Sequence, residues 1–417
     1  MPGTAPRIVS IDAIRGFAVL GILVMNIVGM GLPAYAYVDP TYYGGAQGTD
    51  LWAWATAFVL ADGKMRALFT MLFGASMAIM ADAAEADGRS PAAAHYRRMG
   101  WLLLFGMIHA WLIWYGDILV EYALVGALLY VAREWRPSAV LTGAVVLLVM
   151  AAAFDVALWR GMADAQAAAA APGASLAVRD AWDLTLAGFR PDPAGIAEDI
   201  ALYRGGFAQV FEARAEMTIF MQTIVLPSSL FETLGFAALG LWLLRTGFLT
   251  GACNPRLYRL LAAIALLAAI PATALIARDT IVASFDVVRM QRNDLLSFLL
   301  RPWIAIGYAS LIILWVRSGR ASWLADRLTA AGRMALSNYL VTSLICTTLF
   351  YGYGLGLYAW LGRADLYLVV AAVWMLILLW SALWLQRFSY GPFEWLWRSL
   401  ARRQFQQLRK MRKPIAT

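Results

Sequence analysis

The chain has 417 residues, of which 62% are hydrophobic and 14% are charged. Soluble globular domains are about 45–50% apolar, so this composition excludes an ordinary soluble protein and indicates an integral membrane protein. The formal net charge of +8 could suit nucleic acid, but the basic residues gather in short connecting segments and near the C-terminus, as topology signals do. We therefore expect the lipid bilayer, and no nucleic acid, as a partner. Two cysteines give no disulfide framework, and without a zinc or haem motif we expect no metal.

The first apolar stretch, Ile11 to Leu32, is long enough to predict the first transmembrane helix. Asp12 and Arg15 lie three residues apart at its start, so they share one helical face. They form either an internal ion pair or, because arginine binds phosphate bidentately, a phosphate clamp. Asn26 lies deeper in this helix, where an amide more often links neighbouring helices than binds a substrate.

A second apolar stretch is interrupted at Asp62-Gly63-Lys64. We interpret Leu51–Ala61 as a short interfacial or re-entrant helix and Met65–Met80 as the second span. Lys64 and Arg66 then lie at the outer end of that span. Two roles are open for them: binding of an anionic group, or extension of their long side chains to the membrane interface.

Arg97 to Arg133 predicts two further spans, joined at Tyr115-Gly116-Asp117. His109, one of only two histidines, lies in the first of them, and ionisable residues inside spanning helices are functional candidates. At a rise of about 1.5 Å per residue, His109 lies about 10 Å below the turn and Glu121 about 7 Å below it on the partner helix. Similar depth makes Glu121 the expected partner of His109, whereas Asp117 would cap the outer end. The pair would form a general base, or would only link the two helices.

The remaining apolar stretches complete about ten spans. They are Ser138–Trp159, Met217–Leu244, Leu257–Ile276, Pro302–Val316, Met334–Phe350 and Leu366–Leu385. Glu232 lies near the middle of one of them and should face the interior, and Asn338 lies in another. Residues 160–214 form the one long hydrophilic segment, in which apolar residues recur at helical spacing from Ile196 to Phe211. We expect a long extracytoplasmic loop that carries an amphipathic helix.

Lysine and arginine fall mainly in the connecting segments of one side, which predicts that both termini are cytoplasmic. The sequence thus predicts an all-α polytopic membrane protein, a bundle of about ten transmembrane helices in which residues 1–417 form a single transmembrane domain. Its basic tail, residues 389–417, mixes tryptophan with arginine and lysine and should lie on the anionic inner leaflet. A homo-oligomer is left open.

Four parts of the chain carry a pattern that spans nearly its whole length. They are Ile8–Ile27, Lys64–Met77, Gly106–Gly126, and a C-terminal set with the motifs GRMALSNYL, FYGYGLGL and GPFEWLWR. In this order they resemble the YeiB-like bacterial membrane proteins, a family classed as a domain of unknown function. That family is distantly similar to transmembrane acyltransferases such as heparan-α-glucosaminide N-acetyltransferase, which pass an acyl group from cytosolic coenzyme A across the membrane by an embedded histidine. The resemblance implies a bacterial inner-membrane protein in which His109 takes that histidine's role and Arg15 lies near the coenzyme A entrance.

We therefore expect a transmembrane acyltransferase that moves an acyl group from cytosolic acyl-coenzyme A to a small-molecule or glycan acceptor. His109 would be the general base or would carry the acyl group, and Asp117 would hold the outer end of the site. Lys64 and Arg66 would bind the acceptor or the acyl oxygen, and Arg15 would bind the donor's phosphates. The full set of expected site residues is His109, Asp117, Glu121, Lys64, Arg66, Arg15, Asn26, Glu232 and Asn338.

Two other classes of function are open. A proton-coupled transporter or exporter of a small metabolite would use His109 and Glu232 as relay residues. Against it, the sequence has no clear internal repeat of the kind that transporters often show. A non-enzymatic envelope scaffold would need neither residue. A tunnel open to both faces and meeting at His109 would favour acyl transfer, whereas a single closed midplane pocket would favour transport.

Overall fold

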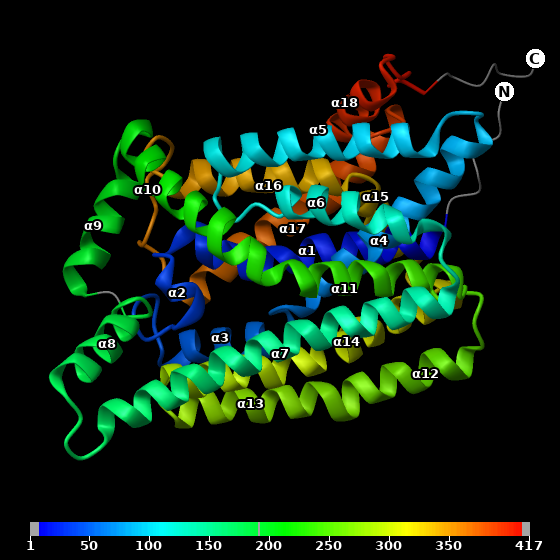
Figure 1. Cartoon of the computed structure of the whole chain (residues 1–417). Helices are drawn as coiled ribbons and strands as arrows, with labels where there is room; N and C mark the ends of the chain where they lie inside the picture. The colour runs from blue at the N-terminus through cyan, green and yellow to red at the C-terminus, as the bar shows by residue number, and fades with distance from the viewer. Residues whose placement is uncertain (1–7, 191, 411–417) are drawn as a thin grey trace, which may run out of the picture.

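The computed structural model describes residues 8–190 and 192–410, and the regular secondary structure in these ranges is helical (Figure 1). These ranges contain seven helical segments that are long and apolar enough to cross a membrane, together with the shorter apolar helix Ala335–Phe350. The predicted all-α membrane architecture is confirmed. The number of ten spans and the cytoplasmic location of both termini stay predictions.

The helices follow one another along the chain with short connections. They are α1 (Val9–Gly31), α2 (Tyr35–Val38), α3 (Gly48–Leu60), α4 (Lys64–Ala86), α5 (Pro91–Leu112), α6 (Leu119–Leu129), α7 (Pro137–Ala170), α8 (Leu176–Ala187), α9 (Pro193–Arg204), α10 (Phe207–Phe220), α11 (Leu226–Arg245), α12 (Pro255–Ile264), α13 (Ile270–Val282), α14 (Val287–Ser318), α15 (Ser322–Arg333), α16 (Ala335–Phe350), α17 (Arg363–Arg387) and α18 (Pro392–Arg402). A 3₁₀ turn, Tyr130–Glu134, follows α6, and the π-helical turns Met221–Val225 and Ala265–Ala269 join α10 to α11 and α12 to α13.

The central helix of the bundle is α1, which packs against α4, α14, α15, α16 and α17 (Figure 1). Its bounds agree with the first predicted span. The helix stops where it does because Pro33 follows: Leu32, the residue before this proline, is extended with φ −129° and ψ 161°.

The interruption at Asp62-Gly63-Lys64 separates α3 from α4, as the sequence predicts. Gly63 has a left-handed backbone conformation with φ 68°, which glycine adopts without steric cost. A Cβ atom on Gly63 would lie 2.3 Å from Nε of Arg301, so glycine is needed for space as well. The break therefore brings a charged side chain of α14 against the junction of α3 and α4.

Three prolines lie inside helical segments, with different results. Pro227 and Pro271 each come two residues after a π-helical turn. Because proline lacks an N–H and its ring crowds the carbonyl four residues earlier, a wider turn relieves the crowding without ending the helix. Pro302 lies inside α14, which begins at Val287. The expectation that this span begins at Pro302 was wrong, since a transmembrane helix accommodates proline where neighbouring groups satisfy the freed carbonyl.

Most of the segment 160–214, which we expected to be a loop, is helical. Its alanine-rich part extends α7 to Ala170, because alanine is the strongest helix former. The helices α8, α9 and α10 follow, and α8 and α9 lie at the end of the bundle opposite α18 (Figure 1). The single amphipathic helix expected from Ile196 to Phe211 is two helices, α9 and α10, separated by Gly205-Gly206.

The C-terminal helix α18 packs against α5 and α16. Nε1 of Trp397 donates to the backbone carbonyl of Arg98 at 2.9 Å, and the guanidinium carbon of Arg98 lies 4.0 Å from the Trp397 ring centre. The carboxylate of Glu394 accepts the backbone N–H of Ser337 at 3.0 Å, near the start of α16. Thus α18 is tied to the two helices that build the site described next. Residues 411–417 of the predicted basic tail lie outside the described residues.

Candidate functional site

His109 and Asp117 form a buried hydrogen-bonded pair. Nδ1 of His109 lies 2.7 Å from Oδ2 of Asp117, and the two side chains are only 1% and 2% exposed. The other carboxylate oxygen of Asp117 accepts the backbone N–H of Val120 at 2.8 Å, which caps the first turn of α6. Both carboxylate oxygens are therefore used, and the hairpin of α5 and α6 fixes the orientation of the imidazole.

The expected pairing of His109 with Glu121 was wrong. Equal depth would pair these residues only if α5 and α6 were ideal helices that met at a single point. In the structure α5 ends at Leu112 and residues 113–118 are not helical, so His109 lies one turn from the helix end and Asp117 folds back beside it. Glu121 lies a turn further along α6 and is directed to α11 instead.

Gly106 allows α6 to begin close to α5. A Cβ atom at this position would lie 2.6 Å from the backbone nitrogen of Val120 and 2.9 Å from Oδ1 of Asp117. Protein interiors are close-packed, so a side chain here would have to displace the capping carboxylate. The glycine thus permits the approach that brings Asp117 to His109.

Tyr339 of α16 is a site residue that we did not predict. Its ring centre lies 5.0 Å from that of His109. Its hydroxyl accepts the backbone N–H of Ile118 and donates to the carbonyl of Gly116, both at 3.3 Å. Tyr339 therefore covers the imidazole and also braces the turn that carries Asp117. Tyr339 directly follows Asn338, an expected site residue, in the motif GRMALSNYL. This position was the signal in the sequence that could have identified it.

The second imidazole nitrogen of His109, Nε2, is buried and has no hydrogen-bond partner within the described ranges. Because a carboxylate only accepts, Nδ1 carries the proton of the bond to Asp117, and this pattern assigns a lone pair to Nε2 of the neutral ring. A nitrogen in this state can take a proton or attack an acyl carbon.

A second polar cluster lies between α4, α11 and α14. Glu232 accepts from Nη2 of Arg66 at 2.8 Å and from Nη1 of Arg301 at 3.1 Å. Arg301 also forms an ion pair with Asp294, whose side chain is 48% exposed. The buried Arg301 and the half-buried Arg66 are thus both matched by carboxylates, as burial of charge in a membrane requires.

The cluster continues to Glu121 through hydroxyl groups. Oε1 of Glu121 accepts from Ser229 at 2.6 Å and from Thr233 at 2.7 Å. Nη1 of Arg66 lies 3.5 Å from the same Thr233 hydroxyl. Negative and positive groups therefore alternate along the cluster. We call the set Glu121, Arg66, Glu232, Arg301 and Asp294 the Glu232 cluster.

Lys64 is enclosed within the bundle, so extension to the membrane interface was wrong for this residue. The Arg66 side chain is 32% exposed, and its extension to the interface stays a prediction. Lys64 is 0% exposed, and its Nζ donates to the carbonyl of Phe58 at 2.6 Å and to the hydroxyl of Ser297 at 3.3 Å. The lysine is therefore enclosed and links the last turn of α3 to α14. Binding of an anionic group by Lys64 or Arg66 stays a proposal.

The other three polar candidates lie outside the pair and the Glu232 cluster. Arg15 donates to Asp12 at 2.9 Å and to Ser76 at 2.7 Å, so the internal ion pair is formed. Asn338 makes hydrogen bonds to residues of α15 and α17 and links those helices to α16. Asn26 is half-buried, and its side chain has no hydrogen bond to another described residue.

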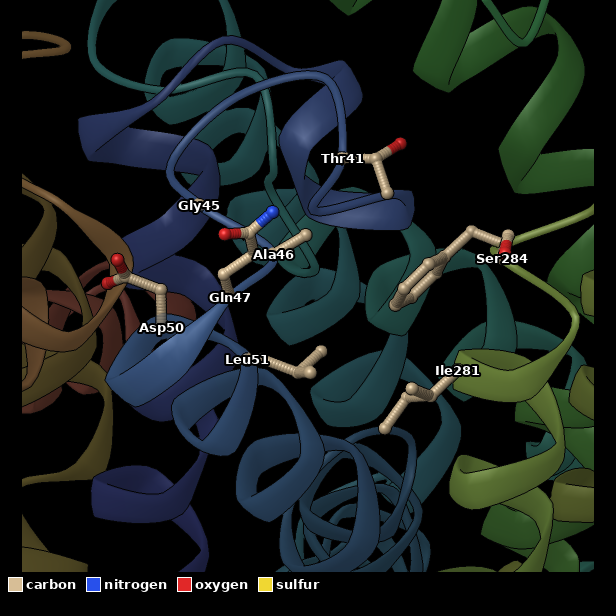
Figure 2. Close-up of a pocket in the computed structure, with 9 residues that line it drawn as sticks. Thr41, Gly45, Ala46, Gln47, Asp50, Leu51, Ile281 and Ser284 are labelled. Atoms are coloured by element: carbon tan, nitrogen blue, oxygen red, sulfur yellow. The ribbon is translucent and has the colours of Figure 1, made fainter.

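An open cavity of about 540 Å³ lies between α3 and the turn from α13 to α14 (Figure 2). Leu51 and Ile281 line one side of it, and the side chains of Gln47 and Ser284 stand at its rim (Figure 2). Its described lining contains neither His109 nor a residue of the Glu232 cluster. This hollow is therefore separate from the candidate site.

Asp199 joins the α9–α10 region to the loop after α16. The hydroxyl of Tyr358 donates to its Oδ2 at 3.0 Å, and the rings of Tyr203 and Tyr358 stack with centres 4.6 Å apart. Burial raises the pKa of Asp199 to about 6; the bond from Tyr358 lowers it in part, and the Glu216 carboxylate raises it. The charge of this carboxyl therefore changes at mildly acidic pH.

Comparisons with known proteins identify the family. A family model described as "Protein of unknown function (DUF418)" matches residues 243–404. The chain is 34% identical over 407 residues to "Uncharacterized protein YeiB" of Escherichia coli (strain K12), covering 95% of this chain and 97% of that protein. It is 30% identical over 426 residues to "Uncharacterized protein YxaH" of Bacillus subtilis (strain 168), covering 98% of each. No solved structure matches the chain. The chain therefore belongs to the YeiB-like DUF418 family.

Proposed function

We propose that the protein is a membrane-embedded acyltransferase in which Nε2 of His109 takes a proton from the acceptor or transiently carries the acyl group. The observation that carries the proposal is the buried Nε2, left without a partner while Asp117 holds Nδ1. Buried polar atoms are nearly always hydrogen-bonded, and exceptions call for an explanation. His95, the other histidine, is also buried, but its Nε2 lies 2.9 Å from the carbonyl of Gly126.

Two routes are open to His109. In the first, the acceptor's hydroxyl or amine gives its proton to Nε2 as its oxygen or nitrogen bonds to the thioester carbon. The carbon–sulfur bond then breaks, and the proton passes to the thiolate of coenzyme A. In the second, Nε2 itself bonds to the acyl carbon as the carbon–sulfur bond breaks and coenzyme A leaves as a thiolate. The acceptor's oxygen or nitrogen then bonds to the acyl carbon, the bond from Nε2 to that carbon breaks, and the acceptor's proton passes to the thiolate. Both routes place positive charge on the imidazole, which the Asp117 carboxylate at 2.7 Å stabilises.

The donor would enter at the end of the bundle that holds the start of α1 and α18 (Figure 1). Arg15 lies in the second turn of α1, in contact with Asp12. A phosphate of coenzyme A would have to take the place of that carboxylate on the guanidinium, a geometrically similar exchange. The acceptor would approach from the opposite end, since His109 lies one turn from the end of α5.

A proton-coupled transporter is the second candidate, and one observation favours it. The Glu232 cluster lies beside the break between α3 and α4, because Arg301 packs on Gly63. Interrupted helices with buried charges are typical of transporter binding sites. Glu232 is paired with two arginines, so proton uptake there would require an ion pair to open.

The test is transfer of a radiolabelled acyl group. Inverted membrane vesicles that contain the protein would receive acetyl-coenzyme A labelled in the acetyl group, and label would be counted in lipid, glycan and small-molecule fractions. We expect His109→Gln to lower transfer by at least about 10²-fold. His95→Gln, at the other buried histidine, is the matched control and should retain transfer. Full activity of folded His109→Gln protein would end the proposal.

A further inference from the structure

The helix α10 covers the end of α5 that carries His109, and one arginine makes much of this contact. Arg214 is 0% exposed. Its Nε donates to the carbonyl of Trp111 at 2.9 Å, and its Nη1 donates to the carbonyl of Ile113 at 3.3 Å. Both carbonyls lie within one helical turn of His109 along the chain. Arg214 therefore binds the segment that connects His109 to the turn between α5 and α6.

These contacts meet a requirement of α5. The last carbonyls of an α-helix have no partner within the helix, and an unsatisfied carbonyl inside a membrane is costly. Thr218, one turn after Arg214, donates to the carbonyl of Ala110 at 3.1 Å. Three side-chain bonds from α10 thus satisfy carbonyls of Ala110 and Trp111 at the end of α5 and of Ile113 just after it. The positive guanidinium also suits the negative end of the helix dipole.

Among the described residues, Arg214 has no carboxylate partner that would explain its burial. No carboxylate of the described ranges lies within 4.0 Å of it, whereas the arginines of the Glu232 cluster are all paired. Its guanidinium carbon lies 5.7 Å and 5.6 Å from the ring centres of Phe207 and Phe211. Burial of a cation without a counter-charge costs free energy of folding. The contact with α5 is therefore the interaction that explains why Arg214 is buried here.

We propose that Arg214 is a positioning residue for His109. By fixing the end of α5 it keeps Nε2 enclosed and keeps the imidazole aligned with Asp117. The inference rests on the proposed function only in treating His109 as the reacting group. The hydrogen bonds from Arg214 to the end of α5 do not depend on that function. The sequence offered a signal: Arg214 follows Phe211 by one helical turn and Phe207 by two, so the three share one helix face.

The presence of only two histidines makes the test direct. Carbethoxylation of each histidine by diethyl pyrocarbonate can be followed by mass spectrometry of the full-length protein in nanodiscs. In the wild type both should react slowly, since His109 and His95 are 0% and 2% exposed. Arg214→Gln loses hydrogen bonds from a charged donor, so the rate at His109 should rise by about tenfold or more. The rate at His95 should not change.

Two further variants, one control and one conservative replacement, complete the test. Arg204→Gln is the matched control, because Nε of Arg204 donates to the carbonyl of Tyr358 at 2.7 Å and so holds α9 rather than α5. It should leave both rates at the wild-type value. Arg214→Lys keeps the charge without the planar fork and should give an intermediate rate at His109; it decides the matter if Arg214→Gln does not fold. An unchanged rate at His109, or equal acceleration in Arg204→Gln, would overturn the positioning role. Label transfer by His109→Gln tests the proposed function separately.

Discussion

Asp117 follows His109 by only eight residues, and their side chains meet at 2.7 Å because the chain reverses between α5 and α6. Both members of the pair therefore come from one helical hairpin. Distant elements then enclose it: Tyr339 of α16 covers the imidazole with ring centres 5.0 Å apart, and Arg214 of α10 closes the end of α5. Because the His109–Asp117 pair is formed within one hairpin and is packed on by other helices, it is held in a single geometry. A catalytic pair needs such a fixed geometry.

The replacement Asp117→Asn should lower acyl transfer by about 10²–10⁴-fold while the protein stays folded. Asparagine can still cap α6 with its amide oxygen, but a neutral amide does not stabilise an imidazolium at His109. Radiolabel transfer by purified protein measures the effect, and thermal unfolding checks the fold. Glu121→Gln is the control, because its amide oxygen can still accept from the hydroxyls on α11. A larger loss in the Glu121 variant than in Asp117→Asn would contradict the pairing.

Glu232→Gln should destabilise the protein by up to roughly 3–5 kcal/mol, because buried Arg301 then keeps only the half-exposed Asp294 and half-buried Arg66 loses its carboxylate. The measurement is the midpoint of thermal unfolding in nanodiscs. The double change Arg66→Gln with Glu232→Gln should cost less than the sum of the two single changes, since the two side chains form one ion pair.

Glu134→Gln is the matched control for the Glu232 cluster, because the side chain of Glu134 is 85% exposed. Exposed ion pairs contribute little, so its unfolding midpoint should not move. The same variants separate the two proposed functions. If Glu232→Gln folds normally and abolishes proton-driven uptake of a metabolite, the transporter hypothesis gains and the structural role of the cluster is wrong.

The carboxyl of Asp199 should make stability depend on pH. Burial raises its pKa to about 6 in the folded protein from 3.8, so the folded state binds the proton more tightly than the unfolded state. Its stabilising contribution is complete below pH 3.8 and is lost as the pH rises through about 6. Asp199→Asn should therefore raise the unfolding midpoint at pH 7.5 relative to wild type and remove this part of the pH dependence. A constant difference between the two proteins from pH 4.5 to 8 would show that Asp199 does not titrate here.

The predicted topology can be tested with the natural Cys253 and one introduced cysteine. Ser284 is exposed in the turn from α13 to α14, which the positive-inside rule places outside, and Cys253 is half-buried in the segment before α12, which it places inside. In spheroplasts, a membrane-impermeant maleimide should label Ser284→Cys in a Cys253→Ser background. Wild-type Cys253 should react only after permeabilisation, and Cys346 is buried. The reverse pattern would invert the bundle.

The two breaks that flank the candidate site could be predicted from this sequence, whereas the break at Gly205-Gly206 and the contacts across the bundle could not. The breaks at Gly63 and at Gly116 occur where expected, because turn residues interrupt apolar runs. The partner of His109 depends on the path of residues 113–118, which no helical period describes. The contact of Arg301 with Glu232 was likewise not predicted. Charged residues lower the hydropathy of the first half of α14, so this part was not recognised as belonging to the helix. Periodicity shows which residues share a helix face, but not which helix faces them.

Substitutions at Gly106 and Gly100 separate the geometry of the His109–Asp117 pair from the stability of α5. Gly106→Ala places a Cβ atom 2.9 Å from Oδ1 of Asp117 and 2.6 Å from the backbone nitrogen of Val120, so the start of α6 must move. We expect label transfer to fall by at least about tenfold, since a displacement of about 1 Å at a reacting group can cost 10²-fold. Gly100→Ala is the matched control on the same helix, because a Cβ atom there meets nothing within 4 Å. It should be active and slightly more stable, as alanine favours a helix over glycine by about 1 kcal/mol. Equal activity of the two variants would show that the close approach of α6 to α5 is not needed for turnover.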